Sequence, residues 1–127
     1  MSNFSNELKL RIWKKAQTDM DNDPDIWRKD SCGAWINFDQ YGKEGKYGWE
    51  VDHVFPESRG GKNDFENLRA MHWSNNRSKG DDFPGYTCSV TSNGNKNVTV
   101  VEQKTVNNDA IKAIKALYPL NSYLQKI

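Results

Sequence analysis

The stretch Trp49-Glu50-Val51-Asp52-His53-Val54-Phe55-Pro56 alternates large apolar residues with polar ones and ends at a proline. Such alternation over a short run is typical of a half-buried β-strand, and a proline commonly marks its end. We therefore predict a strand over residues 49–54. Asp52 and His53, near the end of this strand, have side chains that can bind a metal or transfer a proton, so we expect a functional site there.

The segments that follow predict a hairpin leading into a helix. Residues 57–66 are polar and contain Gly60-Gly61, which is typical of a loop. Residues 67–72 predict a second strand, and Trp73–Lys79 predicts a short helix that a glycine ends. A helix that follows a hairpin packs against its strands, so we expect Asn76 opposite the end of the first strand.

The rest of the chain predicts flanking helices and a second hairpin. The expected elements are an amphipathic helix over 6–17, a short strand over 34–38, a loop over 40–48, strands over 86–91 and 96–102, and an amphipathic helix over 108–117. The Asn93-Gly94 pair favours a tight turn between the two later strands. Asn107, Asn108 or Asp109 could cap the last helix. We expect a small α+β fold with a C-terminal β-hairpin, forming one domain over residues 1–127.

Composition limits the class of protein. The chain has 127 residues, a formal net charge of +1 and a mean hydropathy of -0.94. No apolar run approaches the roughly 20 residues of a membrane helix, and the first residues lack the apolar core of a secretory signal. We predict a cytoplasmic protein with no membrane partner. Its two cysteines, Cys32 and Cys88, are too few for a four-cysteine zinc site, and we expect both to be reduced.

The central stretch supplies the groups that phosphodiester hydrolysis needs: an activated water, a cation at the developing charge, and a hold on the phosphates. His53 can act as a general base because imidazole titrates near neutral pH. The Asp52 carboxylate and the Asn76 amide offer hard oxygen ligands suited to Mg²⁺. Arg77 and Lys79 can bind phosphate oxygens. In a regular strand Asp52 and His53 point to opposite faces, so both serve one site only if the strand ends or twists there.

Each of these residues also has a structural interpretation. His53 could be a strand-end histidine bonded to a carbonyl group, and Asp52 could be a carboxylate in an ion pair. Asn67 is expected to tie the loop through its side chain in either interpretation. The spacing to the following lysine favours Asn76 over Asn75 as the ligand, because adjacent helical residues point about 100° apart.

Taken in order, the motifs resemble the signature of the HNH nuclease family. They are Val51-Asp52-His53-Val54-x-Pro56, Gly60-Gly61, Asn67-Leu68 and Asn76-Arg77-x-Lys79-Gly80-Asp81. The resemblance implies a ββα-metal finger, in which a hairpin and a short helix hold one divalent metal, with its core at residues 49–81. It also implies a metal-dependent endonuclease (a phosphodiester hydrolase) that cuts DNA and leaves 5′ phosphate and 3′ hydroxyl ends.

By position, the resemblance assigns roles to four residues. They are His53 as general base, Asn67 as the residue that holds the loop and orients the histidine, and Asp52 and Asn76 as metal ligands. The basic side chains of Arg77, Lys79, Arg28 and Arg59 are further candidates for phosphate or DNA contacts. The expected metal is Mg²⁺, with Mn²⁺ or Ni²⁺ as substitutes. Many relatives have Cys-x-x-Cys for a structural zinc where this chain has His72-Trp73-Ser74-Asn75, so structural zinc is not expected.

Two other functions stay open from the sequence. One is a finger that binds nucleic acid without cutting it, although a binding module needs no general base. The other is a toxin-type nuclease that acts on DNA or RNA. A single centre is expected to nick one strand, and a double-strand cut requires two nicks or a homodimer.

Overall fold

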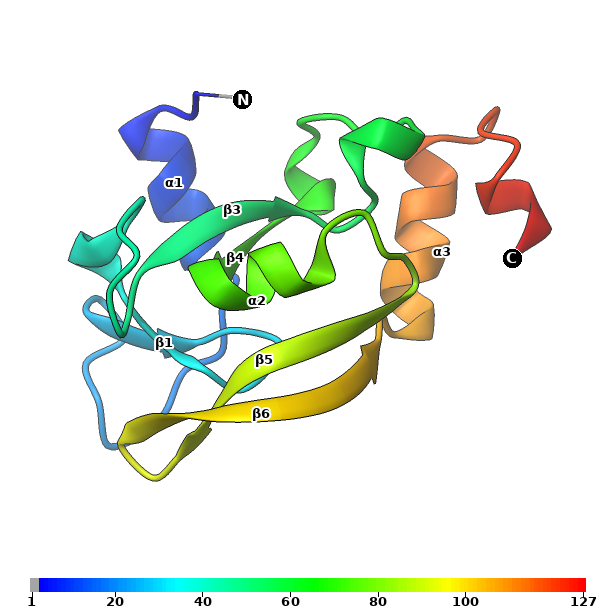
Figure 1. Ribbon diagram of the computed structural model, residues 1–127. Coiled ribbons are helices and arrows are strands. Elements are labelled where there is room, and N and C mark those ends of the chain that lie inside the picture. Colours follow the sequence, from blue (N-terminus) through cyan, green and yellow to red (C-terminus); the bar gives the residue numbers. More distant parts are fainter. Residues whose placement is uncertain (1–2) are drawn as a thin grey trace.

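Three antiparallel hairpins and three α-helices lie within residues 3–127, the part of the chain that the computed structural model describes (Figure 1). The helices are α1 (Asn6–Trp13), α2 (Trp73–Lys79) and α3 (Asn108–Leu117). The strands are β1 (Trp27–Lys29), β2 (Trp35–Asn37), β3 (Trp49–His53), β4 (Leu68–His72), β5 (Gly85–Asn93) and β6 (Lys96–Thr105). This mixed architecture agrees with the α+β class expected from the sequence. None of these helices has the length and apolar character needed to cross a membrane.

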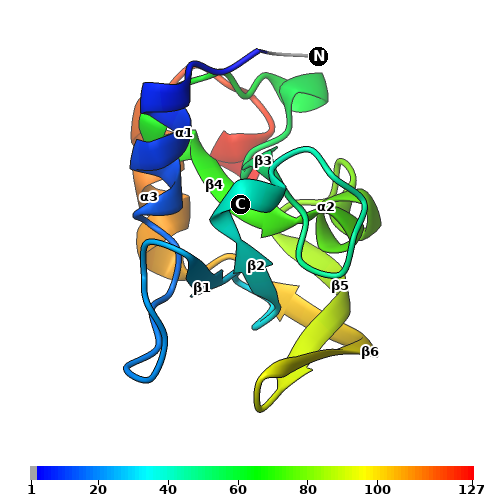
Figure 2. The ribbon, with the colours of Figure 1, turned by 90° about the vertical axis from the view of Figure 1, so that its left-hand side faces the viewer.

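The central hairpin pairs β3 with β4, and α2 follows β4 directly. His72 caps α2, because its Nδ1 accepts a hydrogen bond from the backbone N–H of Ser74 at 3.1 Å. Gly80 ends the helix at a positive φ of 52°. Seen from the side, the hairpin lies between α1 and α2 (Figure 2). The predicted strands and helix of this segment are therefore confirmed to within a residue or so.

The two faces of the central hairpin bury different side chains. Trp49, Leu68 and Ala70 pack toward α1, in a cluster completed by Ile12, Trp13 and Ile36. The opposite face carries Met71, which packs into a second cluster built from β5, α3 and the segment after β3. Because strand side chains alternate, Glu50 and Asp52 share the Met71 face and so face α2. Burial of each large apolar side chain contributes about 1.5–3 kcal/mol, which fixes the hairpin between its two neighbours.

The C-terminal hairpin is longer than its sequence predicts. β5 pairs with β6 so that Asn93 faces Lys96, which places Gly94 and Asn95 in the turn. The sequence predicts a turn centred one residue earlier, at Asn93-Gly94. Gly94 takes the left-handed conformation, with φ at 63°. Of the three candidate caps of α3, Asn107 is the one that caps it, since its Oδ1 accepts from the N–H of Ala110 at 2.8 Å.

The first helix is shorter than predicted, and one strand was not predicted at all. The apolar spacing predicts a helix over 6–17, but α1 ends at Trp13. Beyond it, Gln17 pairs with Lys29 through two backbone hydrogen bonds of 3.0 and 2.9 Å. This pairing draws residues 14–17 away from the helical path and toward β1, which pairs with β2. A long-range backbone contact thus overrides the local helical preference.

The expectation of two reduced cysteines is wrong in this structure. Cys32 and Cys88 form a disulfide whose Cα atoms are 5.9 Å apart. The two residues are separated by 56 positions in the sequence. The fold brings the turn after β1 beside β5, and this proximity cannot be seen in the spacing of the cysteines.

Candidate active site between the central hairpin and its helix

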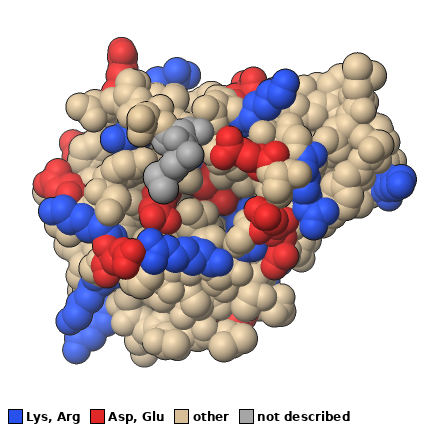
Figure 3. Space-filling model, turned by 45° about the horizontal axis from the view of Figure 1, so that its top comes forward, with Lys and Arg blue, Asp and Glu red and all other residues tan. Residues whose placement is uncertain are grey.

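A pocket of about 520 Å³ lies where the end of β3 meets α2. Its lining residues are Phe4, Tyr41, Gly42, Glu50, Val51, Asp52, His53, Pro56, Glu57, Asn76, Arg77, Gly80 and Asp81. Residues from both faces of β3 line it, so Asp52 and His53 reach the same pocket although they are neighbours in a strand. Figure 3 shows acidic side chains gathered near the middle of the top face, with basic side chains beside them. The pocket is thus rich in carboxylates, which suits a cation.

His53 is held by the loop that follows β3. Its Nε2 lies 2.7 Å from the Oδ1 of Asn63, and its Nδ1 lies 3.7 Å from the carboxylate of Glu57. An amide oxygen can only accept a hydrogen bond, so Nε2 is the donor, and in the neutral ring the lone pair then lies on Nδ1. The side chain is 13% exposed. The imidazole is therefore fixed at one nitrogen and open at the other.

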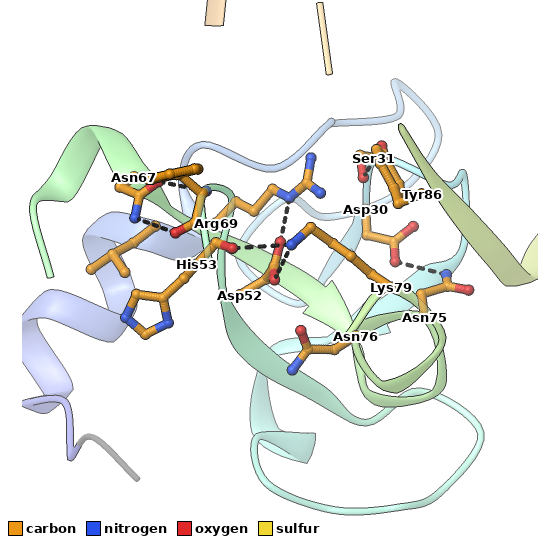
Figure 4. A network of polar contacts seen from close by, with 12 residues as sticks. Asp30, Ser31, Asp52, His53, Asn67, Arg69, Asn75, Asn76, Lys79 and Tyr86 are labelled. Atoms are coloured by element: carbon orange, nitrogen blue, oxygen red, sulfur yellow. Dashed lines mark hydrogen bonds and ion pairs between the residues drawn. The ribbon is translucent and has the colours of Figure 1, made fainter. Parts of the chain in front are cut away.

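Asp52 is buried between two cations (Figure 4). Its Oδ2 accepts a hydrogen bond of 2.8 Å from the Nε of Arg69, and its Oδ1 lies 3.3 Å from the Nζ of Lys79. Lys79 also donates to the backbone oxygen of His53 at 3.1 Å. Burial lowers the pKa of the Lys79 ammonium, and the Asp52 carboxylate opposes that effect. The two cations fix the Asp52 carboxylate beside the pocket.

Asn76 comes from α2 and faces β3. Its Nδ2 donates a hydrogen bond to the Oε1 of Glu50 at 3.0 Å. In Figure 4 its amide oxygen lies on the side of Asp52. Asp52 and Asn76 therefore present two hard oxygen donors to one pocket, a donor set that fits Mg²⁺ or Mn²⁺. Within residues 3–127, no cluster of three or more His, Cys, Asp or Glu side chains is arranged to hold a metal. A cation here would thus depend on the amide and on water or phosphate oxygens.

Asn67 ties the loop and does not contact the imidazole. Its Oδ1 accepts from the N–H of Phe55 at 2.8 Å, and its Nδ2 donates to the carbonyl groups of Phe55 and Lys62. Gly61 passes so close to this point that a Cβ would lie 1.9 Å from the carbonyl oxygen of Phe55. The Gly-Gly loop is therefore closed by Asn67, while Asn63 provides the contact to His53.

The four predicted phosphate contacts lie in different environments. Arg77 and Arg59 are at the surface: Arg77 pairs with Glu44 at 2.6 Å, and Arg59 donates to the carbonyl group of Asp81 at 3.0 Å. Arg28 is 9% exposed, and its guanidinium donates to three backbone carbonyl groups of residues 14–24. Lys79 is 1% exposed. The burial of Arg28 and Lys79 does not fit a surface phosphate contact, because both cations already have partners inside the protein.

A second polar cluster lies between α2, β5 and the turn after β1. Asp30 is 1% exposed, and it accepts hydrogen bonds from the N–H groups of Cys32, Ala34 and His72 and from the Nδ2 of Asn75. Burial raises the pKa of Asp30, and these hydrogen bonds partly offset the rise. Asn75 also bonds the backbone of β5 at Ser89 and Val90. His72 and Asn75 thus belong to a hydrogen-bonded link between the turn after β1, α2 and β5.

Three residues of these two clusters were not singled out from the sequence. Glu50 could have been found, since strand alternation places it on the same face as Asp52. Asn63 lies in a polar loop, and no local pattern separates it from its polar neighbours. Asp30 is 45 positions away from its partner Asn75, and only the fold shows that they meet.

Comparison with known proteins finds one family match, which covers this part of the chain. Residues 35–82 match the sequence model of the HNH endonuclease family. No curated protein and no solved structure matches the chain. The matched segment contains β3, β4 and α2, and with them most of the residues that line the pocket. The pocket between the central hairpin and α2 therefore lies mostly within the segment that is similar to HNH endonucleases.

Proposed function

We propose that this protein is a metal-dependent endonuclease that hydrolyses DNA phosphodiester bonds at the pocket between β3 and α2. The observation that carries the proposal is the meeting of His53, Asp52 and Asn76 at one pocket within an HNH domain. Membership of this family suggests a nuclease, and HNH nucleases generally use a divalent metal. The ββα-metal finger is proposed for β3, β4 and α2, whose order and pairing are those of a hairpin followed by a helix.

In this proposal His53 is the general base. Its Nδ1 holds the free lone pair, because Nε2 is bonded to Asn63. When Nδ1 takes a proton from water, the ring becomes a cation, and the Glu57 carboxylate at 3.7 Å stabilises it. Glu57 is 57% exposed, so this stabilisation is modest. Asn67 contributes indirectly, by holding the loop that carries Asn63.

Asp52 and Asn76 would hold the divalent cation, expected to be Mg²⁺. When bound, such a cation stabilises the charge that develops on the leaving oxygen. The chain supplies the rest of the arrangement. Arg69 and Lys79 keep the Asp52 carboxylate in place from behind, and α2 holds Asn76 opposite β3.

Arg77 and Arg59 are the proposed phosphate contacts of the substrate. Arg77 lines the pocket and its side chain is 52% exposed, so its guanidinium can turn from Glu44 to a phosphate. Arg59 is not part of the pocket lining, but it donates to the carbonyl group of the lining residue Asp81 and stacks over the ring of Tyr123 at 4.7 Å. Two such contacts give weak binding that weakens further as salt is raised. We propose low sequence preference for the same reason.

The first experiment measures nicking of supercoiled plasmid by the purified protein with Mg²⁺, with EDTA, and with the His53→Ala variant. We expect metal-dependent nicking that falls by roughly 10²- to 10⁴-fold in the variant, as for loss of a general base. Circular dichroism of the variant checks that it folds. No cutting with Mg²⁺, Mn²⁺ or Ni²⁺, together with a retained mobility shift of DNA, would instead support a binding module. Faster cutting of RNA than of DNA would move the proposal to an RNA substrate.

Three further proposals concern the whole protein. We propose that residues 1–127 form one domain, which a single cooperative unfolding transition would support. We propose that cutting of both strands, if observed, comes from a homodimer, which size-exclusion chromatography with DNA would detect. We also propose a cytoplasmic location. A Cys32–Cys88 disulfide that stays formed in protein trapped directly from cells would contradict it, because cytosolic thiols are kept reduced.

A further inference from the structure

Glu50 is a carboxylate of the pocket that the proposed reaction does not use. It lies two residues before Asp52 on β3, so both side chains face α2. Its Oε1 accepts the hydrogen bond from the Nδ2 of Asn76, and its Oε2 lies 3.7 Å from Arg77. The side chain of Glu50 is 30% exposed. Glu50 is therefore a partly buried carboxylate, and the Asn76 amide is its one hydrogen-bonded partner within residues 3–127.

This contact decides which end of the Asn76 amide faces the pocket centre. A carboxylate can only accept hydrogen bonds, so Asn76 must present its NH₂ group to Glu50. Its oxygen then points to the opposite side, where Asp52 lies (Figure 4). If the amide were turned over, its two N–H donors would face the position of a cation and would disfavour binding there. A rotatable side chain is thus held in the orientation in which it can be a ligand.

We propose that Glu50 is a positioning residue that fixes Asn76 in its metal-binding orientation. The inference rests on the proposed function, because it assumes that Asn76 binds a divalent cation. Arg77 supports the arrangement from the rim of the pocket, where it pairs with Glu44 and lies near Glu50. Glu50 acts through Asn76 and need not touch the cation or the substrate.

The test is the affinity for Mn²⁺, measured by electron paramagnetic resonance at constant pH without nucleic acid. Glu50→Asp keeps the charge but cannot reach the amide, and Glu50→Gln keeps the reach but loses the charge. We expect E50D to weaken Mn²⁺ binding roughly tenfold or more, as for loss of an outer partner of a ligand. We expect E50Q to stay within about threefold of wild type, since its amide oxygen accepts the same bond more weakly.

Two reference variants complete the experiment. Glu44→Ala removes another carboxylate partner of Arg77, one that is not the acceptor of the Asn76 amide, and it is expected to leave Mn²⁺ affinity unchanged. Asn76→Ala removes the proposed ligand itself. E50D binding like wild type, or E50Q weaker than E50D, would overturn the positioning role. If Asn76→Ala also leaves Mn²⁺ affinity unchanged, the metal role of Asn76 in the proposed function fails, and this inference fails with it. Thermal melts of each variant exclude unfolding as the cause.

Discussion

Asn75 and Asn76 are neighbours on α2, yet their side chains make contacts on different sides of the helix. Asn75 is fully buried, and both ends of its amide are bonded, to Asp30 and to the β5 backbone at Ser89 and Val90. Asn76 lines the pocket, and its amide bonds Glu50 through the nitrogen. The difference follows from the helical turn of about 100° per residue, which sends one side chain inward and the other toward β3. The same residue type is a structural link in one place and a candidate ligand in the next.

The two buried aspartates repeat this contrast. Asp30 is surrounded by neutral N–H donors, and burial raises its pKa. Asp52 is paired with the cations of Arg69 and Lys79. The neutral donors link Asp30 to its neighbours in the protein interior, whereas the two cations hold the charged Asp52 carboxylate beside the pocket. The hydrogen-bonded cluster of Asp30 and Asn75 therefore stabilises the fold, whereas the pocket between α2 and β3 carries the proposed chemistry.

The largest expected effect comes from loss of the Cys32–Cys88 disulfide, in the region of Asp30 and Asn75. The Cys32→Ser/Cys88→Ser double variant should lower the free energy of unfolding by about 4 kcal/mol, because the bond closes a loop of more than fifty residues. Urea denaturation of the oxidised wild type and the variant measures the difference. An equal midpoint and slope for both proteins would show that the disulfide adds nothing to the free energy of unfolding.

Asn75→Ala should come next, with a loss of about 3 kcal/mol in the free energy of unfolding. The variant leaves buried partners at Asp30 and on β5 without a hydrogen bond, and each such group costs about 1–3 kcal/mol. Thermal denaturation measures the loss. A change below 1 kcal/mol would mean that water replaces the amide, and the contrast between Asn75 and Asn76 would lose its basis.

Lys79→Met should cost about 3 kcal/mol of stability, toward the low end for a broken buried ion pair because Arg69 still pairs with Asp52. The loss should be nearly independent of salt, since Lys79 is 1% exposed and its charge is shielded from solution ions. Urea denaturation at low and high salt tests both statements. A strong salt dependence would place Lys79 at the surface, where the sequence motif had suggested a phosphate contact.

Asn76→Ala should have the smallest effect on stability, within about 0.5 kcal/mol, since it removes one partly exposed hydrogen bond. Its plasmid nicking should nevertheless fall roughly tenfold or more if the amide is a metal ligand. Thermal denaturation and the nicking assay, run on the same preparation, separate the two quantities. Full activity in this variant would remove Asn76 from the proposed site and leave Asp52 alone.

Much of the candidate site could be predicted from the sequence because its signals are local. Strand alternation predicts β3 and the shared face of Glu50 and Asp52. Gly80 marks the end of α2, and the separation of Asn75 and Asn76 around the helix follows from their numbers alone. These features depend on residues within one or two turns of each other. The sequence by itself therefore determined the order of the hairpin and helix and the identity of the pocket's central residues.

Only the tertiary structure decided how each polar group is used. The end of α1 depends on the pairing of Gln17 with Lys29, and the burial of Lys79 depends on its contact with Asp52, 27 positions earlier in the printed sequence. The disulfide joins residues 56 positions apart. Backbone pairing and desolvation act between groups that are close in space, and a local pattern carries no information about that distance. This is the physical reason why the sequence suggests that Lys79 binds a phosphate, whereas in the fold Lys79 forms a buried ion pair with Asp52.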